Sequence, residues 1–428
     1  MVTFTSSLSA RRLPQRPRPG KAPNLDTRDA GSARAVPRRV VLYSHDTLGL
    51  GHVRRNLAIA GAFVRGEPRP DILLISGVPA ARAFALPPGV DCITLPGIAK
   101  SADGSYRPRS LSVPLEELVD LRAQTIRAAV AAFRPDLLVV DKVPLGAFGE
   151  LLPTLRTLAV HGRTRTVLGL RDVLDRPKQA RREWAADGGN DAVERYYDAV
   201  WVYGDPRVVD PVSDYGLPAS VADKVTFTGY LAPNAPVPGP SALGLDKPYA
   251  LCLVGGGQDG AHLAETFVCA DLPAHTAGVV VAGPYLPADA RHRLHQLAAA
   301  RAADRHAIDF VDEPLPLIAG ASSVVAMGGY NTTVELLGLH KRTLLVPRVR
   351  PRGEQLVRAA RLARLGVVDL LHPDRLSPPA LSAWLRDGDR PRVESGGVLD
   401  LDGLARLPAL ASALVGNVET QGVTRAVS

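Results

Sequence analysis

The sequence predicts an α/β protein made of two doubly wound domains that face each other across a cleft. At 428 residues the chain is too long for one ordinary domain and fits two, each with a core of its own. Short apolar runs alternate with helix-like stretches in both halves. Valine, leucine and alanine supply most of the apolar mass, and aromatic residues make up only 5% of the chain, which suits buried parallel strands covered by helices.

The expected elements fall into two groups on either side of a proline-rich stretch. In the first half, strands are expected at 40–44, 71–76, 90–95, 136–140, 166–170 and 199–202, with helices from about 53 and over 114–133. In the second half, strands are expected at 249–254, 277–281, 308–311, 323–327 and 343–346. Residues 233–248 contain little to bury and are interpreted as a linker. We therefore expect a first domain over 40–232, a second over 249–415, and a short tail over 416–428.

The basic charge of the chain is concentrated at its start. Residues 1–39 hold nine basic and two acidic residues, which accounts for seven of the eight net positive charges. This segment lacks apolar periodicity and is expected to be a disordered tail. Because the remaining chain is nearly neutral, no nucleic-acid partner is expected.

Neither a secretory signal nor a membrane-spanning stretch is recognisable in the sequence. Cys92, Cys252 and Cys269 are widely spaced and form no metal or disulfide pattern. These observations predict a cytoplasmic protein with at most peripheral contact at the inner face of the membrane.

The first expected strand ends in a glycine-containing loop that carries a histidine. Gly49 and Gly51 open the loop at the carboxyl end of the strand and place His52 at a helix start, facing the expected cleft. An imidazole there can act as a base near neutral pH, because the helix dipole disfavours its protonated form. The alternative is a histidine that only packs the loop.

Other residues of this loop have weaker assignments. His45 could contact an acceptor or fix the loop, and Arg54 and Arg55 could face an anionic ligand or solvent. An NAD site is disfavoured, because Arg54 replaces the third glycine of the dinucleotide pattern and the second strand is not followed by an acid.

A second glycine loop follows the first strand of the second half. Gly256 and Gly257 permit close approach of the backbone to a diphosphate, and Gln258 adds a neutral amide donor. The lysine and Ser/Thr of a P-loop are missing, which disfavours ATP hydrolysis. A plain turn is the alternative.

A third glycine pair opens a longer polar segment. Gly328 and Gly329 precede a helix-like pattern, so free backbone amides there can bind an anion. Asn331 or Thr332 can cap the helix, and Glu335 lies one turn on, where a carboxylate can bind two sugar hydroxyls. A further polar pair, Glu354 and Gln355, opens another helix and could read a second sugar ring. A turn followed by an amphipathic helix is the alternative.

Charged pairs also follow two buried strands of the first half. Arg171, with Asp172, and the pair Asp141 and Lys142 could line an acceptor site or form salt bridges within loops. Two Asp-x-Asp sequences, at 387–389 and 400–402, match a cation-binding pattern of some sugar transferases. Turn chemistry explains them better, and no metal is expected.

Taken together, these motifs resemble those of the GT-B glycosyltransferases of family 28, which include the N-acetylglucosaminyltransferase of peptidoglycan synthesis. The stretch Tyr-Ser-His-Asp-Thr-Leu-Gly-Leu-Gly-His is also similar to that of a group of uncharacterised bacterial proteins described as predicted glycosyltransferases. The resemblance covers about residues 40–384. It implies two Rossmann-like domains, the first for an acceptor and the second for a nucleotide sugar.

The resemblance also implies roles for individual residues. Gly256, Gly257 and Gln258 would meet the donor diphosphate, the backbone around Phe310 and Val311 the nucleobase, Glu335 the ribose, Glu354 and Gln355 the donor sugar, and His52 the acceptor. Leu48 and Leu50 replace glycines of the family's first loop, and Tyr330 and Asn331 differ in the ribose motif. The sugar and the acceptor are therefore not carried over.

The implied activity is that of a hexosyltransferase. It would move a sugar from a nucleotide-diphosphate donor to an acceptor hydroxyl, lipid-linked or small, with inversion and with no metal or cofactor besides the nucleotide sugar. Three alternatives remain open at this stage. They are a nucleotide-sugar hydrolase or 2-epimerase of the same fold, a sugar-nucleotide-binding protein without turnover, and nucleic-acid binding through the basic head.

Overall fold

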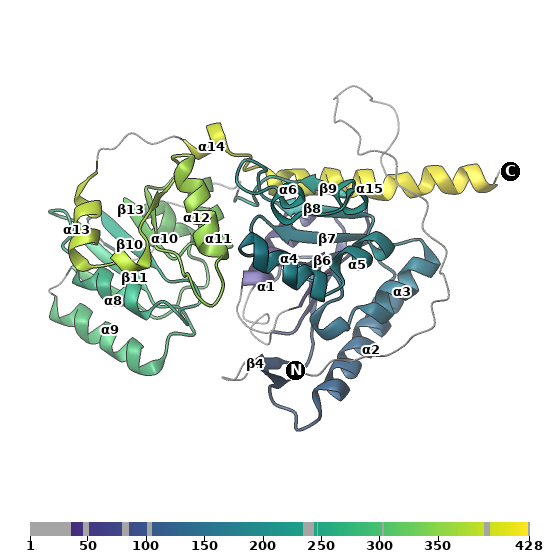
Figure 1. Ribbon diagram of the computed structural model, residues 1–428, viewed down its shortest axis with the longest axis horizontal. Coiled ribbons are helices and arrows are strands. Elements are labelled where there is room, and N and C mark those ends of the chain that lie inside the picture. The colour runs from purple at the N-terminus through teal and green to yellow at the C-terminus, as the bar shows by residue number, and fades with distance from the viewer. Residues whose placement is uncertain are drawn as a thin grey trace.

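The computed structural model describes residues 36–45, 51–78, 85–100, 105–233, 244–245, 247–301, 304–388 and 394–426. Two α/β domains stand side by side, the first at the right of Figure 1 and the second at the left. Each contains one parallel sheet, of seven strands in the first domain and six in the second. The predicted fold class is confirmed.

The seven strands of the first sheet lie where the short apolar runs predict them, apart from the last. In spatial order they are β3 (Val90–Thr94), β2 (Asp71–Ser76), β1 (Arg39–Ser44), β6 (Leu137–Asp141), β7 (Arg165–Arg171), β8 (Ala199–Tyr203) and β9 (Val225–Phe227). The short edge strand β9 was not predicted. A separate antiparallel hairpin, β4 (Ile98–Lys100) with β5 (Tyr106–Pro108), was not predicted either.

Both faces of the first sheet are buried by helices. Val40 and Leu42 of β1 point into one apolar cluster, and Val41 and Tyr43 point into another on the opposite face, as strand geometry requires. The helical elements of this domain are α1 (Gly51–Val64), α2 (Leu115–Phe133), η2 (Ala147–Gly149), α3 (Leu152–His161), α4 (Pro177–Ala186), α5 (Gly189–Tyr196), α6 (Pro211–Tyr215) and α7 (Ala219–Ala222).

The second sheet repeats the layout of the first. Its spatial order is β12 (Arg305–Ile308), β11 (Ala277–Val281), β10 (Tyr249–Leu253), β13 (Ser323–Ala326), β14 (Thr343–Leu345) and β15 (Asp369–Leu370). The strand predicted at 308–311 is wrong by three residues. Its true segment is an edge strand whose residues are all only partly buried, so it has no continuous apolar run to find.

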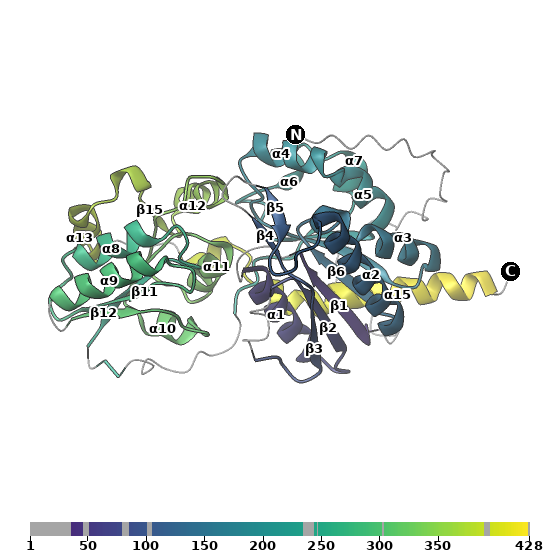
Figure 2. The same ribbon diagram turned by 90° about the horizontal axis from the view of Figure 1, so that it is seen from below.

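Helices on the second domain complete the doubly wound pattern. They are α8 (Ala261–Cys269), α9 (Ala288–Ala300), α10 (Leu315–Gly320), α11 (Tyr330–Gly338), α12 (Glu354–Arg364), η3 (Pro373–Arg375), α13 (Pro378–Arg386) and α14 (Ser395–Val398). Helices α11 and α12 lie on the side that faces the first domain, as both views show (Figures 1 and 2).

Each sheet reverses its order of strands once, and these reversals position the site. The first sheet grows from β1 toward β3 and then resumes on the other side of β1 with β6. The second does the same at β10 and β13. Loops that leave the carboxyl ends of two such neighbouring strands diverge, and the crevice between them is where α/β proteins bind ligands.

The chain crosses between the domains twice, at adjacent points. Leu231 forms a bridge with Asp402, and Tyr230 N donates to Asp400 O over 2.8 Å. The final helix, α15 (Gly403–Ala426), then runs along the first domain and packs against α1 (Figure 1). The expected second domain, 249–415, thus includes the start of a helix that covers the first domain. Most of the expected linker and of the basic tail lies outside the described residues.

The two domains are joined by a buried interface. One continuous cluster of buried apolar side chains runs from the first sheet to the second and includes Tyr230 and Tyr330. Tyr330 also donates its hydroxyl hydrogen to Tyr203 O over 2.9 Å. None of the described helices is long and apolar enough to cross a membrane.

Candidate functional site

His52 is held by a buried carboxylate at the point where the first sheet reverses its order. It lies at the start of α1, directly after β1, and Asp141 is the last residue of the neighbouring strand β6. Nδ1 of His52 lies 2.5 Å from Oδ2 of Asp141. Because the carboxylate can only accept, Nδ1 carries the hydrogen, and Nε2 is the ring nitrogen left to take a proton.

Arg55 completes this cluster. Its Nη2 donates to both carboxylate oxygens of Asp141 over 2.6 Å and lies 2.8 Å from Nδ1 of His52. Although burial opposes ionisation, Arg55 and His52 hold the pKa of Asp141 well below its usual range. The carboxylate is therefore charged at all working pH values.

The imidazole of His52 is neutral near pH 7. Burial lowers its pKa to about 4, with Arg55 acting in the same direction and Asp141 against both. The side chain of His52 keeps 17% of its exposure whereas that of Asp141 keeps 1%, so part of the ring is open to solvent and its partner is buried. A neutral, oriented imidazole is a suitable general base.

The other acceptor-side candidates surround His52 to different degrees. The His45 ring lies edge-on to the His52 ring, with centroids 4.6 Å apart. Arg171 is the last residue of β7, one strand beyond Asp141. Gly51 is the first residue of α1, and Gly49 lies outside the described residues.

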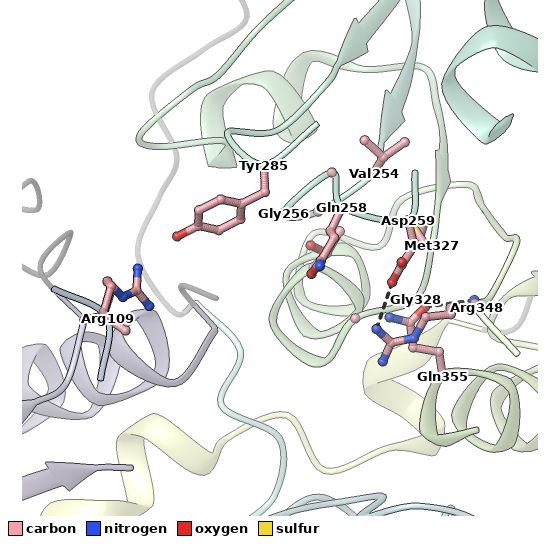
Figure 3. A pocket seen from close by; sticks show the side chains of 15 residues that line it. Arg109, Val254, Gly256, Gln258, Asp259, Tyr285, Met327, Gly328, Arg348 and Gln355 are labelled. Carbon is pink, nitrogen blue, oxygen red and sulfur yellow. Dashed lines mark hydrogen bonds and ion pairs between the residues drawn. The ribbon is translucent and has the colours of Figure 1, made fainter. Parts of the chain in front are cut away.

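A pocket of about 380 Å³ opens where the second sheet reverses its order (Figure 3). Seven residues expected to bind the donor line it: Gly256, Gly257, Gln258, Gly328, Gly329, Thr332 and Gln355. They come from the loop after β10, the loop after β13 and the starts of α11 and α12. The structure thus brings together residues that lie up to a hundred positions apart in the sequence.

Two glycines explain why the pocket has its shape. Gly257 has φ +88°, and a Cβ there would lie 2.3 Å from Ala282 O, so no larger residue fits. Gly329, in contrast, has φ −60° as the residue before α11, and a Cβ there would meet no atom within 4 Å. The first glycine is required by packing, and the second leaves open space in front of a helix start.

The start of α11 carries backbone amides that no side chain caps. Such amides attract an anion. Asn331 does not cap the helix as expected; its Nδ2 donates to Gly51 O over 2.9 Å. This bond ties the first turn of α11 to the residue before His52, so the histidine of one domain lies beside the helix start of the other.

Glu335 forms an ion pair across the domain boundary. Its Oε1 accepts from Arg54 Nη2 over 2.8 Å, while Oε2 is buried without a hydrogen-bond partner. Burial raises the pKa of Glu335 to about 7, against the effect of Arg54. One carboxylate oxygen thus has no hydrogen-bond partner among the described residues, and Glu335 is not among the residues that line the pocket.

The polar pair at the start of α12 is arranged around Arg348. Glu354 Oε1 accepts from Arg348 Nη2 over 2.6 Å, and Gln355 Oε1 accepts from Arg348 N over 3.0 Å. Asp259 also binds Arg348, as the dashed line in Figure 3 shows. Gln355 lines the pocket, whereas Glu354 is buried behind Arg348. Val311, expected near a base, packs against the core and does not line the pocket.

Several residues of the site escaped the sequence analysis as site residues. Arg348, Asp259 and Tyr285 line the pocket from the second domain, and Arg109 reaches it from the first (Figure 3). Tyr285 follows β11, so its place at the carboxyl end of a central strand could have marked it. Arg55, expected to face an anionic ligand or solvent, instead pairs with Asp141.

Comparison with solved structures extends these observations. The glycotransferase of kitacinnamycin matches with a TM-score of 0.54 at 16% identity, over 90% of this chain and 99% of its own. A candidate UDP-N-acetylglucosamine 2-epimerase from Listeria monocytogenes matches with a TM-score of 0.55 at 12% identity, over 89% and 96%. The glycosyltransferase VinC, solved with dTDP, matches with a TM-score of 0.53 at 15% identity, over 89% and 98%.

The chain therefore has the GT-B fold. The likeness extends over both domains. No protein-family model matches the sequence, and no curated protein does. The resemblance to family 28 in particular stays a prediction.

Proposed function

We propose that this GT-B protein is a glycosyltransferase that moves a sugar from a nucleotide-diphosphate donor to an acceptor hydroxyl, with inversion and without a metal ion. One observation supports the proposal. His52, oriented by Asp141, follows Gly51, whose carbonyl accepts a hydrogen bond from Asn331 in the first turn of α11, and the start of α11 lines the glycine-rich pocket. A base on the first domain and an anion site on the second would then lie close together across the domain boundary.

In the proposed reaction His52 acts on the acceptor. Nε2 takes the hydroxyl proton as the acceptor oxygen attacks the anomeric carbon, from the face opposite the leaving group. The new C–O bond forms while the bond to the diphosphate oxygen breaks, and the diphosphate leaves with the electron pair. Asp141 stabilises the imidazolium that results, because its carboxylate stays charged.

The leaving diphosphate is the proposed ligand of the second domain. Backbone amides around Gly256 and Gly257 and at the start of α11 supply fixed dipoles, and Arg348 supplies a positive charge at the same pocket. Glu335 would accept hydroxyl hydrogens of the ribose through Oε2, which has no partner in the structure. Arg348 and Gln355 would contact the donor sugar.

The test is a screen of nucleotide sugars against matched variants. We expect a UDP-, dTDP- or GDP-sugar to raise the melting temperature and to be consumed when an acceptor is present. His52→Ala is expected to lower kcat by about 10²–10⁴ while nucleotide binding persists. His295→Ala is the control, since His295 also pairs with an aspartate, Asp309, but on the surface of the second domain.

The same screen separates the alternatives. A hydrolase would release free sugar without an acceptor, and a 2-epimerase would convert the nucleotide sugar without one. A binding protein would be stabilised by nucleotide and would show no difference between wild type and His52→Ala. If no nucleotide sugar binds or is consumed, the proposal fails.

A further inference from the structure

Two cations at the carboxyl edge of the first sheet have no carboxylate partner. Lys142 directly follows β6 and Arg171 ends β7, and these strands are neighbours in which Asp141 pairs with Gly169. Within the part of the chain that the structure describes, neither side chain has an acidic group within 4 Å. Burial and then the charge of Arg171 lower the pKa of Lys142, so the two positive charges lie close enough to repel each other, and we call them the Lys142/Arg171 pair.

The surrounding arginines differ from this pair, because each has its own counter-charge. The ion pairs are Arg55 with Asp141 at 2.6 Å, Arg358 with Asp172 at 2.6 Å, Arg352 with Glu183 at 2.9 Å, and Arg348 with Glu354 at 2.6 Å. Lys142 and Arg171 differ from these four arginines in having no carboxylate in direct contact among the described residues.

Holding both charges in this place is unfavourable without an anion. Among the described residues, Arg171 Nε is buried with no hydrogen-bond partner, and so is Nδ1 of His45. Burial, together with Arg171 and Arg352, lowers the pKa of Lys142 to about 7, and burial lowers the pKa of Arg171 to about 10. A bound anion would offset this cost for both groups.

We propose that the Lys142/Arg171 pair binds an oxyanion group, such as a phosphate or carboxylate, that the acceptor carries. This inference rests on the proposed transferase function and adds the chemical class of the acceptor. The position favours the acceptor over the donor. The pair lies on the first domain, where Lys142 directly follows Asp141, the partner of His52, and Arg171 ends the neighbouring strand β7. The donor diphosphate has amides and Arg348 on the second domain.

Sulfate is a suitable probe, because its charge stays constant between pH 5 and 9 while that of Lys142 changes. Lys142 faces Asp141 on β6, Arg171 on β7, Glu183 on α4 and Arg352 in the loop before α12. An anion favours protonated Lys142. Sulfate binding should therefore tighten as the pH falls from about 8.5 to 6, and this dependence should be absent in Lys142→Met.

The experiment measures sulfate binding calorimetrically in the full chain, with and without a saturating nucleotide diphosphate. The variants are Lys142→Met, Arg171→Gln and, as a charge-matched control, Lys178→Gln, because Lys178 is exposed on α4. Loss of one charge-assisted contact should weaken sulfate binding about tenfold to a hundredfold, and the control should match wild type. Arg171→Lys keeps the charge and should retain most of the binding if Arg171→Gln folds poorly.

The outcomes separate the possible sources of the anion. Sulfate binding that persists under saturating nucleotide and is lost in both variants supports an acceptor site. The proposal is overturned if nucleotide displaces sulfate, or if Lys142→Met weakens nucleotide binding as strongly as it weakens sulfate binding. The pair would then belong to the donor diphosphate. Equal sulfate binding in all variants, or none in wild type, also overturns it.

A failure of the transferase proposal would look different. The chain would then bind no nucleotide sugar, whereas sulfate binding would still depend on Lys142 and Arg171. Once an acceptor is known, the KM for an acceptor with its anionic group, compared with the same acceptor without it, gives the direct check. The KM without the anionic group, divided by the KM with it, should exceed one in the wild type and fall toward one in Lys142→Met.

Discussion

The ion pair between Arg358 and Asp172 offers a sharp test of how the domains are held together. Both side chains are 0% exposed. Arg358 donates to Asp172 through Nε at 2.8 Å and Nη2 at 2.6 Å, and Tyr230 donates its hydroxyl to the same carboxylate at 3.0 Å. Arg358 Nη1 also donates to Gly328 O over 3.1 Å, so the pair connects the first domain to a loop of the pocket.

Asp172→Asn keeps the shape of the side chain and removes its charge. The guanidinium of Arg358 then stays buried without a counter-ion, which costs about 3–5 kcal/mol for pairs of this kind. For domains of this size about 2–4 °C corresponds to each kcal/mol, so we expect the melting temperature to fall by about 6–20 °C. Thermal and urea unfolding measure the effect.

A double-mutant cycle separates the pair from its surroundings. Arg358→Met alone should also lower the free energy of unfolding. The double variant should lose less than the sum of the two single losses, because it leaves no buried charge without a counter-ion. Asp289→Asn is the control, since Asp289 pairs with Arg293 on the surface of α9 and its loss should leave stability unchanged. Strictly additive effects, or no change in Asp172→Asn, would refute the reasoning.

Four further predictions concern the site. Asp141→Asn should lower kcat by about 10²–10⁴ with little change in nucleotide affinity, and a rate loss no larger than that of a surface variant would contradict this. The kcat of the wild-type protein at saturating substrates should stay constant as the pH falls. It should decline only near the pKa of His52, about 4, where Nε2 becomes protonated. A decline of kcat near pH 6.5 would mean that another group is the base. Because the folded pKa of Glu335 is raised to about 7, its contribution to stability is present below pH 4.5 and lost as the pH rises through 7, so Glu335→Gln should flatten stability over that window in thermal unfolding. Gly329→Ala should leave the melting temperature unchanged and weaken nucleotide binding, whereas Gly257→Ala should lower both, and equal melting temperatures in the two variants would contradict the packing argument.

The architecture was predictable because local signals agree with the fold. Buried strands such as β1 and β10 are continuous apolar runs. The glycine loop after β10 lines the pocket, and the helix after β1 carries His52. Edge strands gave weaker signals. β12 is half buried and begins with arginine and histidine, so its position was misjudged.

The partners of the site residues were less predictable. His52 meets Asp141 only because β1 and β6 pair in a register that places Ser44 opposite Asp141, and the sequence does not state that register. Glu335 pairs with Arg54 because the two domains meet, although the two residues lie 281 positions apart in the chain. Sequence patterns locate polar residues at strand ends, whereas the assignment of partners depends on long-range geometry.

The double crossing between the domains limits how the cleft can open. Leu231 and Asp402 fix the outgoing and returning segments side by side, so an axis of rotation must pass close to both. Parts near that axis move little, while Arg109 and Tyr285, on opposite walls of the pocket, should separate when the cleft opens. Such an opening would break the Arg54–Glu335 ion pair, which joins the two domains. A pair of fluorescent labels across the pocket would follow this motion, with a pair across the crossing as its fixed reference.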